Sequence, residues 1–164
     1  MSARVTSAVR IAALRPDHRA GLERLLVDTG YFRIDEVAVA LEVFDACCAA
    51  PDADYSGHAA LAGDGSLAGY IIYGPTPCTL GTWDIYWIAV APAFQRGGVG
   101  SLLIDEVERR LSGRARLILV ETSGQPLYAS TRAFYERRGF TEVARIPDFY
   151  ADGDDRVILA RRVL

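Results

Sequence analysis

The 164-residue sequence lacks the long apolar runs and basic clusters that mark two large classes of protein. No apolar stretch approaches the roughly 20 residues that a membrane-spanning helix needs, so a membrane protein is not expected. Arginines come in pairs rather than clusters and the formal net charge is −3, so nothing indicates nucleic-acid binding. Arg4 and Arg10 interrupt the apolar residues near the N-terminus, which disfavours a secretory signal and predicts a cytoplasmic protein.

Cysteine and histidine are scarce, and their spacing fits neither a disulfide framework nor a metal site. The cysteines Cys47, Cys48 and Cys78 are odd in number and form no Cys-x-x-Cys pair. The histidines His18 and His58 have no histidine, cysteine or carboxylate partner at metal-ligand spacing. We therefore expect no metal cofactor, and we interpret Cys47 and Cys48 as small core residues of a helix.

The strongest motif in the chain is the glycine-rich segment Gln95-Arg96-Gly97-Gly98-Val99-Gly100-Ser101. It is followed by no Gly-Lys-Ser/Thr and lacks the order Gly-x-Gly-x-x-Gly, so it is neither a Walker loop nor a dinucleotide fingerprint. An apolar stretch typical of a buried strand precedes it at 83–90, and apolar residues at helical spacing follow it over 99–111. The first turn of such a helix leaves backbone N–H groups without partners at the positive end of the helix dipole, which suits a pyrophosphate.

Hydrophobic periodicity and turn residues predict elements in the order βααβββαβαββ. This order indicates an α/β (α+β) fold, in which helices flank a mixed and mostly antiparallel sheet, and the length indicates one domain over residues 1–164. The strand expected at 116–120 is continuously apolar, so we expect it to be buried on both faces. The other strands are expected at 4–14, 56–62, 67–73, 83–90, 140–146 and 156–163, and the helices at 17–27, 34–50, 99–111 and 127–138.

A second motif follows one strand later, in the segment Phe134-Tyr135-Glu136-Arg137-Arg138-Gly139-Phe140. Gln95-x-x-Gly98-x-Gly100 resembles the acetyl-CoA loop of the GNAT N-acetyltransferase superfamily, and the second motif resembles its Tyr-x-x-x-Gly-Phe signature. The resemblance is close from about residue 55 onward and extends to the first third only in general layout. It implies an enzyme that transfers an acetyl group from acetyl-CoA, its co-substrate, to a primary amine of a small molecule or protein.

The resemblance also assigns the coenzyme contacts. A backbone N–H of Val90 or a neighbour would face the thioester carbonyl, because the strand is commonly bulged there in the superfamily. Many relatives carry asparagine seven residues before the signature tyrosine, where this chain has Tyr128, so the contact with the coenzyme arm is altered here. The residues implied to bind acetyl-CoA are Ile88, Ala89, Val90, Gln95, Arg96, Gly97, Gly98, Val99, Gly100, Ser101 and Tyr128.

Two carboxylates are candidates for the base that acyl transfer to an amine needs, since only about one alkylamine in 10³ is unprotonated near pH 7. Asp84 lies six residues before Val90, a spacing similar to that of the strand glutamate in some histone-acetylating GNAT enzymes. The alternative is that Asp84 is a structural hydrogen-bond acceptor that ties down the loop at 75–82. Glu121 ends the next strand, where it binds the amine, serves as base or caps the following loop. Tyr86 shares a face with Asp84 and lines the acceptor pocket or packs beneath helices.

Aromatic residues supply the remaining candidates. The resemblance implies that Tyr135 lies near the thioester sulfur and protonates the departing thiolate, and the alternative is an aromatic core residue. Tyr31 and Phe32, between the first two helices, contact the acceptor or only fix the helix corner. Together, Asp84, Glu121 and Tyr135 are the catalytic candidates, and Tyr31, Phe32 and Tyr86 are the substrate-binding ones.

No cysteine or serine has the surroundings of a covalent nucleophile, so we expect direct attack by the amine within a ternary complex. An alternative from another class is a non-catalytic acyl-CoA sensor or interaction module that keeps the glycine-rich loop without the chemistry. Acylation of oxygen, or use of a longer acyl donor, is a third interpretation. Members of the superfamily often dimerise, so a homodimer is among the expectations.

Overall fold

The structure of the protein is a computed structural model in which residues 8–163 are described. The order of its main elements confirms the predicted βααβββαβαββ. Three single-turn 3₁₀ helices accompany them: η1 Pro16–His18, η2 Pro92–Phe94 and η3 Pro126–Tyr128. The helices are α1 Arg19–Thr29, α2 Ile34–Ala49, α3 Val99–Leu111 and α4 Ala129–Arg137. The strands are β1 Arg10–Ala13, β2 Ser56–Leu61, β3 Leu67–Pro75, β4 Thr82–Val90, β5 Leu117–Ser123, β6 Thr141–Ala151 and β7 Asp154–Arg162.

The strands form one seven-stranded sheet in the order β1-β2-β3-β4-β5-β7-β6. β4 and β5 are parallel, whereas β1 with β2, β5 with β7, and β6 with β7 are antiparallel. The predicted α/β class, with a mixed and mostly antiparallel sheet flanked by helices, is confirmed. The chain divides into two compact units, one holding the described residues up to Ile72 with Trp87–Glu108, the other Tyr73–Tyr86 with the residues from Arg109 on. The single-domain organisation stays a prediction.

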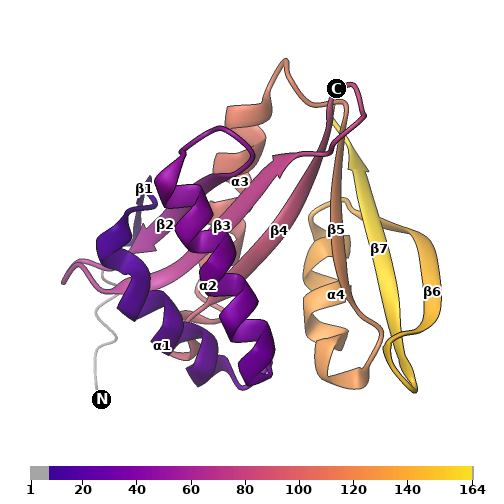
Figure 1. Ribbon diagram of the computed structural model, residues 1–164, viewed down its shortest axis with the longest axis horizontal. Helices are drawn as coiled ribbons and strands as arrows, with labels where there is room; N and C mark the ends of the chain where they lie inside the picture. Colours follow the sequence, from indigo (N-terminus) through magenta and orange to yellow (C-terminus); the bar gives the residue numbers. More distant parts are fainter. Residues whose placement is uncertain (1–7, 164) are drawn as a thin grey trace. The chain divides into compact units, whose positions relative to one another are not determined.

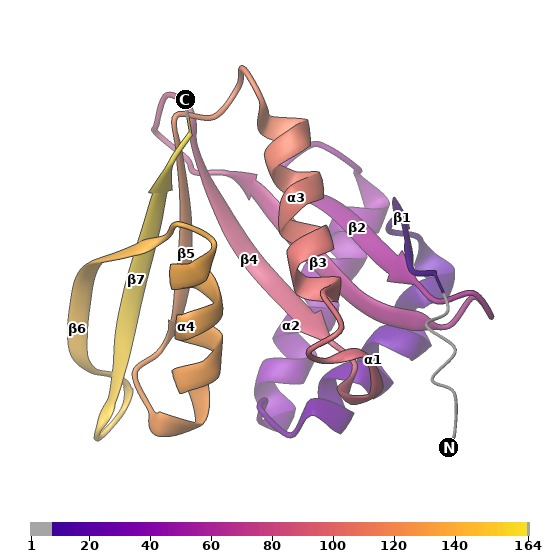
Figure 2. The ribbon, with the colours of Figure 1, turned by 180° about the vertical axis from the view of Figure 1, so that it is seen from behind.

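In the first unit, helices cover both faces of the strands (Figures 1 and 2). The hairpin of α1 and α2 packs on Tyr70 and Ile72 of β3, and Gly30, with φ of 70°, ends α1 in the left-handed conformation. α3 lies on the opposite face, where Val99 approaches the position that a side chain on Gly69 would occupy. The apolar residues of the hairpin that build this core are Leu22, Leu25, Leu26, Val37, Ala40, Leu41, Phe44 and Cys47.

Cys47 is thus a small core residue, as predicted, while Cys48 is only partly buried against the same cluster. The third cysteine, Cys78, is exposed. Burial raises the pKa of the Cys47 thiol to about 11, so this side chain stays an uncharged apolar group at neutral pH.

In the second unit, β7 lies between β5 and β6, and α4 covers one face of these strands (Figure 2). Ile118 and Val120 of β5 are buried, whereas Leu117 and Leu119, which alternate with them, are only partly buried. The prediction that this strand is buried on both faces was therefore wrong. A continuous apolar run does not reveal that one face of the strand borders an open hollow.

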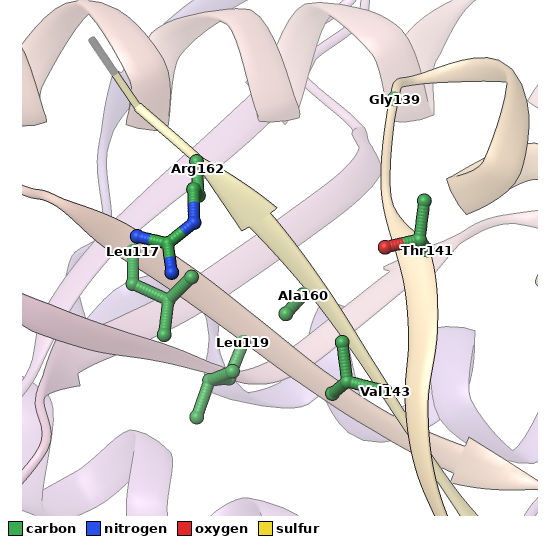
Figure 3. A pocket seen from close by; sticks show the side chains of 7 residues that line it. All are labelled: Leu117, Leu119, Gly139, Thr141, Val143, Ala160 and Arg162. Carbon is green, nitrogen blue, oxygen red and sulfur yellow. The ribbon is translucent and has the colours of Figure 1, made fainter.

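That hollow measures about 370 Å³ and lies along β5, β7 and β6 (Figure 3). The guanidinium of Arg162 lies beside Leu117 in it (Figure 3). Arg162 makes no ion pair with the described residues, and apart from this cation and Thr141 the lining of the hollow is apolar. It is lined by Leu117, Leu119, Gly139, Thr141, Val143, Ala160 and Arg162.

Element boundaries differ from the prediction mainly in β1 and β6. The predicted first strand began at residue 4, but residues 4–7 lie outside the described residues. β6 continues past the predicted end at Ile146, through Pro147, with an irregular register before Ala151. β6 is the last strand of the sheet, so the missing N–H of proline interrupts no ladder on its outer side.

Two glycines give opposite predictions for stability. A Cβ on Gly69 would lie 2.9 Å from the carbonyl oxygen of Ala89 on the neighbouring strand, so Gly69→Ala lowers the free energy of unfolding by about 1–3 kcal/mol. A Cβ on Gly21, within α1, would lie at an ordinary contact distance of 3.6 Å from Leu67. Gly21→Ala therefore raises the free energy of unfolding by about 0.5–1 kcal/mol, because alanine loses less conformational entropy than glycine when a helix forms. Denaturant unfolding measures both, and equal effects of the two substitutions would contradict the close approach of β3 and β4.

Candidate functional site

The start of α3 presents a set of backbone amides for which the described residues supply no acceptor. The first hydrogen bond of α3 runs from the N–H of Leu102 to the carbonyl of Gly98, at 3.0 Å. The N–H groups before it have no intrahelical partner and no other acceptor among the described residues. Being at the start of a 13-residue helix, they also lie at the positive end of its dipole. These amides belong to Gly98, Val99, Gly100 and Ser101.

The turn depends on two residues with positive φ, Arg96 at 61° and Gly98 at 84°. No atom lies within 4 Å of the position that a Cβ on Gly98 would take, so the backbone is open on that side. At Gly97 a Cβ would come within 3.2 Å of the carbonyl oxygen of Phe94. Glycine therefore lets the chain turn tightly and leaves its amides accessible to a ligand.

Gln95 braces this turn. Its side-chain amide donates to the carbonyl oxygen of Val90 at 3.2 Å, which ties the glycine-rich segment to the end of β4. The N–H of Ala91 in turn donates to Ala68 of β3 at 2.8 Å. Gln95 thus has a structural contact, and its predicted coenzyme contact, like that of Arg96, is not tested by the described residues.

β4 pairs with β5 only over residues 82–85, and its remaining backbone, which includes Ile88, Ala89 and Val90, carries no ladder with β5. The register shows no bulge within the paired part. The predicted role of a Val90 N–H as donor to the thioester carbonyl stays a prediction.

Phe32, one of the two predicted acceptor contacts between α1 and α2, packs on Trp87 with ring centroids 5.6 Å apart and borders the core. The neighbouring Tyr31 is partly buried, and its N–H donates to the hydroxyl of Thr29 at 3.4 Å. The structure thus gives Phe32 the corner-fixing contact that was the alternative to substrate binding, and acceptor contact by either residue stays a prediction.

Asp84 accepts a hydrogen bond from the Thr76 hydroxyl at 2.5 Å, so it ties down the loop between β3 and β4, as one of its two interpretations predicted. The bond engages Oδ2, and Oδ1 makes no hydrogen bond with the described residues. Asp84 stands opposite Leu119 in the β4–β5 register, which places both on the face that carries the hollow. Tyr86, two residues on, shares that face and is 38% exposed.

Glu121 also lies on this face, and its carboxylate is engaged by the guanidinium of Arg156 on β7. The Cζ atom of Arg156 stands 4.7 Å from the centre of the Phe149 ring. Arg156 and Phe149 are neighbours of this candidate carboxylate that sequence reasoning missed. The pairing depends on the β5–β7 and β6–β7 registers, for which the linear pattern carries no signal.

Tyr135 is buried in α4, between Phe134 at 5.4 Å and Phe140 at 5.6 Å between ring centroids. Burial raises the pKa of its phenol above the ordinary value of 10, because the phenolate would lose its hydration. The residue is therefore an uncharged phenol at neutral pH. Its packing agrees with the core interpretation, and its role near the sulfur stays a prediction.

The loop between β5 and α4 is braced by side chains that the sequence analysis also missed. Arg132 donates to the carbonyl oxygens of Ser123 at 2.7 Å and of Gln125 at 3.0 Å. The Ser123 hydroxyl donates to Asp154 at 2.5 Å, which fixes the loop to β7. Tyr128, the residue in place of the family asparagine, is the last residue of η3, which belongs to this loop and directly precedes α4.

Residues 8–163 are the part of the chain that the structure describes. Its histidines, cysteines and carboxylates form no cluster of three or more suited to a metal ion. None of its helices combines the length and the apolar character that crossing a membrane requires.

The burial of Tyr135 predicts how stability depends on pH. Its folded-state pKa is raised, so above about pH 10 the phenol ionises in the unfolded chain but stays neutral in the folded one. The free energy of unfolding of the wild type, relative to that of Tyr135→Phe, is constant at lower pH. It falls by about 1.4 kcal/mol per pH unit above that point. Denaturant unfolding across this range measures the difference, and a constant difference would show that the phenol is hydrated in the folded state.

Comparison with known proteins agrees with this geometry. Residues 54–142, more than half of the chain, match the family described as acetyltransferase (GNAT) domain. No curated protein matches the sequence. A Desulfovibrio desulfuricans structure assigned to the GNAT family superposes with a TM-score of 0.89 at 42% identity, covering 96% of this chain and 100% of that one.

Two more distant structures share the fold. Arabidopsis thaliana NAA60 in complex with acetyl-CoA has a TM-score of 0.77 at 17% identity, over 95% of this chain and 99% of that one. The aminoglycoside 6'-N-acetyltransferase from Enterococcus faecium has a TM-score of 0.74 at 18% identity, over 94% and 97% respectively. Because the family match spans more than half of its length and the Desulfovibrio structure is 42% identical over nearly all of it, this chain belongs to the GNAT acetyltransferase family.

Proposed function

We propose that this protein transfers an acetyl group from acetyl-CoA to a primary amine, by direct attack of the amine within a ternary complex. The observation that carries the proposal is the set of four N–H groups at the start of α3, from Gly98 to Ser101, for which the described residues supply no acceptor. Amides that point one way at the positive end of a helix dipole bind phosphate oxygens without any cationic side chain.

The residues fit the diphosphate of a coenzyme A ester. The open space at Gly98 lets phosphate oxygens reach the main chain, and Gln95 holds the turn in shape through Val90. We assign Arg96, Gly97 and Tyr128 to the same ligand by family resemblance, with the backbone of Ile88, Ala89 and Val90 receiving its acyl end. Bound acetyl-CoA supplies an activated acyl group. Arabidopsis NAA60, which shares the fold, has been crystallised with acetyl-CoA.

For the acceptor we assign the two carboxylates different tasks. Asp84 has one oxygen that makes no hydrogen bond with the described residues, and it serves as the base; its short side chain makes a bridging water the natural relay. Glu121 holds the acceptor ammonium, because its carboxylate already binds a cationic group in Arg156. Tyr86 and the loop residues Tyr31 and Phe32 are assigned to the acceptor by their predicted positions.

Tyr135 is assigned to the departing sulfur. Burial raises the pKa of its phenol, whereas an ordinary thiol has a pKa near 8.5, so full proton transfer to the thiolate is uphill. The phenol therefore acts as a hydrogen-bond donor that stabilises negative charge on sulfur, and solvent completes the protonation. Thiol release with an amine separates this enzyme from an acyl-CoA sensor, which binds the coenzyme and releases none.

Substitution of Gly98 tests the role of the glycine-rich segment. Gly98→Glu places a carboxylate against the phosphates and lowers acetyl-CoA affinity by about 100-fold or more, measured by calorimetry. Gly113→Glu is the matched control, because Gly113 has a similar φ of 74° with no atom within 4 Å of its Cβ position, at the other end of α3. Acetyl-CoA binding that survives Gly98→Glu, or fails equally in Gly113→Glu, would refute the assignment of the loop.

Substitution of Tyr135 tests its assigned role at the departing sulfur. Tyr135→Phe lowers turnover by about 10- to 100-fold with little change in acetyl-CoA affinity, because only the donor to the departing sulfur is lost. Tyr70→Phe is the control, since Tyr70 is a fully buried tyrosine of the first unit whose hydroxyl has no hydrogen-bond partner within residues 8–163. A thiol-release assay with a panel of amines measures turnover, and unchanged turnover in Tyr135→Phe would remove this residue from the mechanism.

A further inference from the structure

The face of the second unit that carries Glu121 also carries a cation placed directly beside it. Nη2 of Arg156 donates to Oε1 of Glu121, and the side chains keep 25% and 37% of their accessible surface respectively. Both charged groups are therefore held together and both are within reach of a ligand from solvent. A site built for a purely cationic acceptor would have no reason to place a guanidinium against its carboxylate.

Arg156 is held in one orientation but is short of acceptors. Its guanidinium lies over the ring of Phe149, 4.7 Å from the ring centre, and this stacking fixes the plane of the fork. A guanidinium carries five N–H donors, and the bond to Glu121 uses one. The buried Nε atom has no hydrogen-bond partner among the described residues. A ligand from solvent does not reach this buried atom, whereas the Nη hydrogens that Glu121 does not engage are donors for a ligand that brings oxygen acceptors.

An aromatic wall borders this pair. Phe149 and Tyr150 lie edge to face with ring centroids 5.0 Å apart, and their side chains are 48% and 40% exposed. Both belong to β6, next to Arg156 on β7. The rings offer an apolar surface to the carbon skeleton of a small molecule held by the two charges.

We propose that Arg156 binds a carboxylate of the acceptor while Glu121 binds its ammonium, so that the acceptor is a small amine that also carries a carboxylate, as an α-amino acid does. A carboxylate accepts two parallel hydrogen bonds from a guanidinium, and the adjacent Glu121 then faces the ammonium of the same molecule. The role of the bound molecule as acetyl acceptor rests on the proposed function, whereas its recognition by the charge pair does not.

The test compares each amino acid of a panel of L-amino acids with its own amide, which keeps the amine and the side chain and removes the carboxylate. Binding is followed by calorimetry in the presence of coenzyme A, and acetyl transfer by thiol release from acetyl-CoA. The wild type binds at least one amino acid about tenfold or more tightly than its amide, because the amide forfeits the charge-assisted pair with Arg156. No binding by any amino acid of the panel, or equal binding of acid and amide, overturns the proposal.

Two variants of Arg156 and one control locate the effect. Arg156→Gln abolishes the preference for the acid over the amide, and Arg156→Lys retains a weaker one, because an ammonium keeps the charge and loses the fork. The control is Arg162→Gln, six residues along the same strand, where the arginine makes no ion pair with the described residues, and it leaves the preference unchanged. Circular dichroism and coenzyme A binding establish that each variant is folded. A preference that persists in Arg156→Gln overturns the proposal.

The two readouts separate this inference from the proposed function. Amino acids that bind through Arg156 without thiol release from acetyl-CoA support the recognition and refute the transfer. Thiol release with amides as fast as with amino acids supports the transfer and refutes the recognition.

Discussion

The opening of α3 is the constraint on which the functional argument depends. A helix cannot satisfy its first N–H groups internally, and here none of the described residues accepts a hydrogen bond from them. Gly98 makes this possible because its positive φ turns the chain sharply without a side chain over the amides. The Gln95 side chain then holds the turn against Val90, so the amides are preorganised rather than merely exposed.

β4 leads into this turn, and the end of β4 is closely packed against β3. Gly69 of β3 leaves room for the carbonyl of Ala89 and for Val99 of α3, which both approach the position that a Cβ on Gly69 would take. Close packing around Gly69 therefore helps to position the backbone that precedes the glycine-rich turn. Positioning of this kind lowers the entropy that a ligand has to lose on binding.

In the second unit every candidate catalytic group has a partner or an enclosure of its own. Asp84 accepts from Thr76, Glu121 is paired with Arg156, and Tyr135 is packed between aromatic rings. Placing an unpaired carboxylate on a largely apolar pair of strands costs free energy, so each carboxylate needs a structural partner. A structural contact of this kind is compatible with a catalytic role for the same residue. The arginine that pairs with Glu121 indicates most about the ligand, because a guanidinium beside a carboxylate is complementary to a molecule that carries both a negative and a positive charge.

The sequence by itself determined the order of elements, the glycine-rich turn and the family, because periodicity, turn chemistry and short motifs are local and are written into consecutive residues. It also placed Asp84 and Tyr86 on one face through the alternation of a strand. The tertiary structure alone decided which side chains from other strands meet them. Arg156 reaches Glu121 only through the register of β7 on β5, and Leu119 borders a hollow that residues of β6 and β7 help to line. Register and layer coverage depend on contacts between distant segments, and no local pattern specifies them.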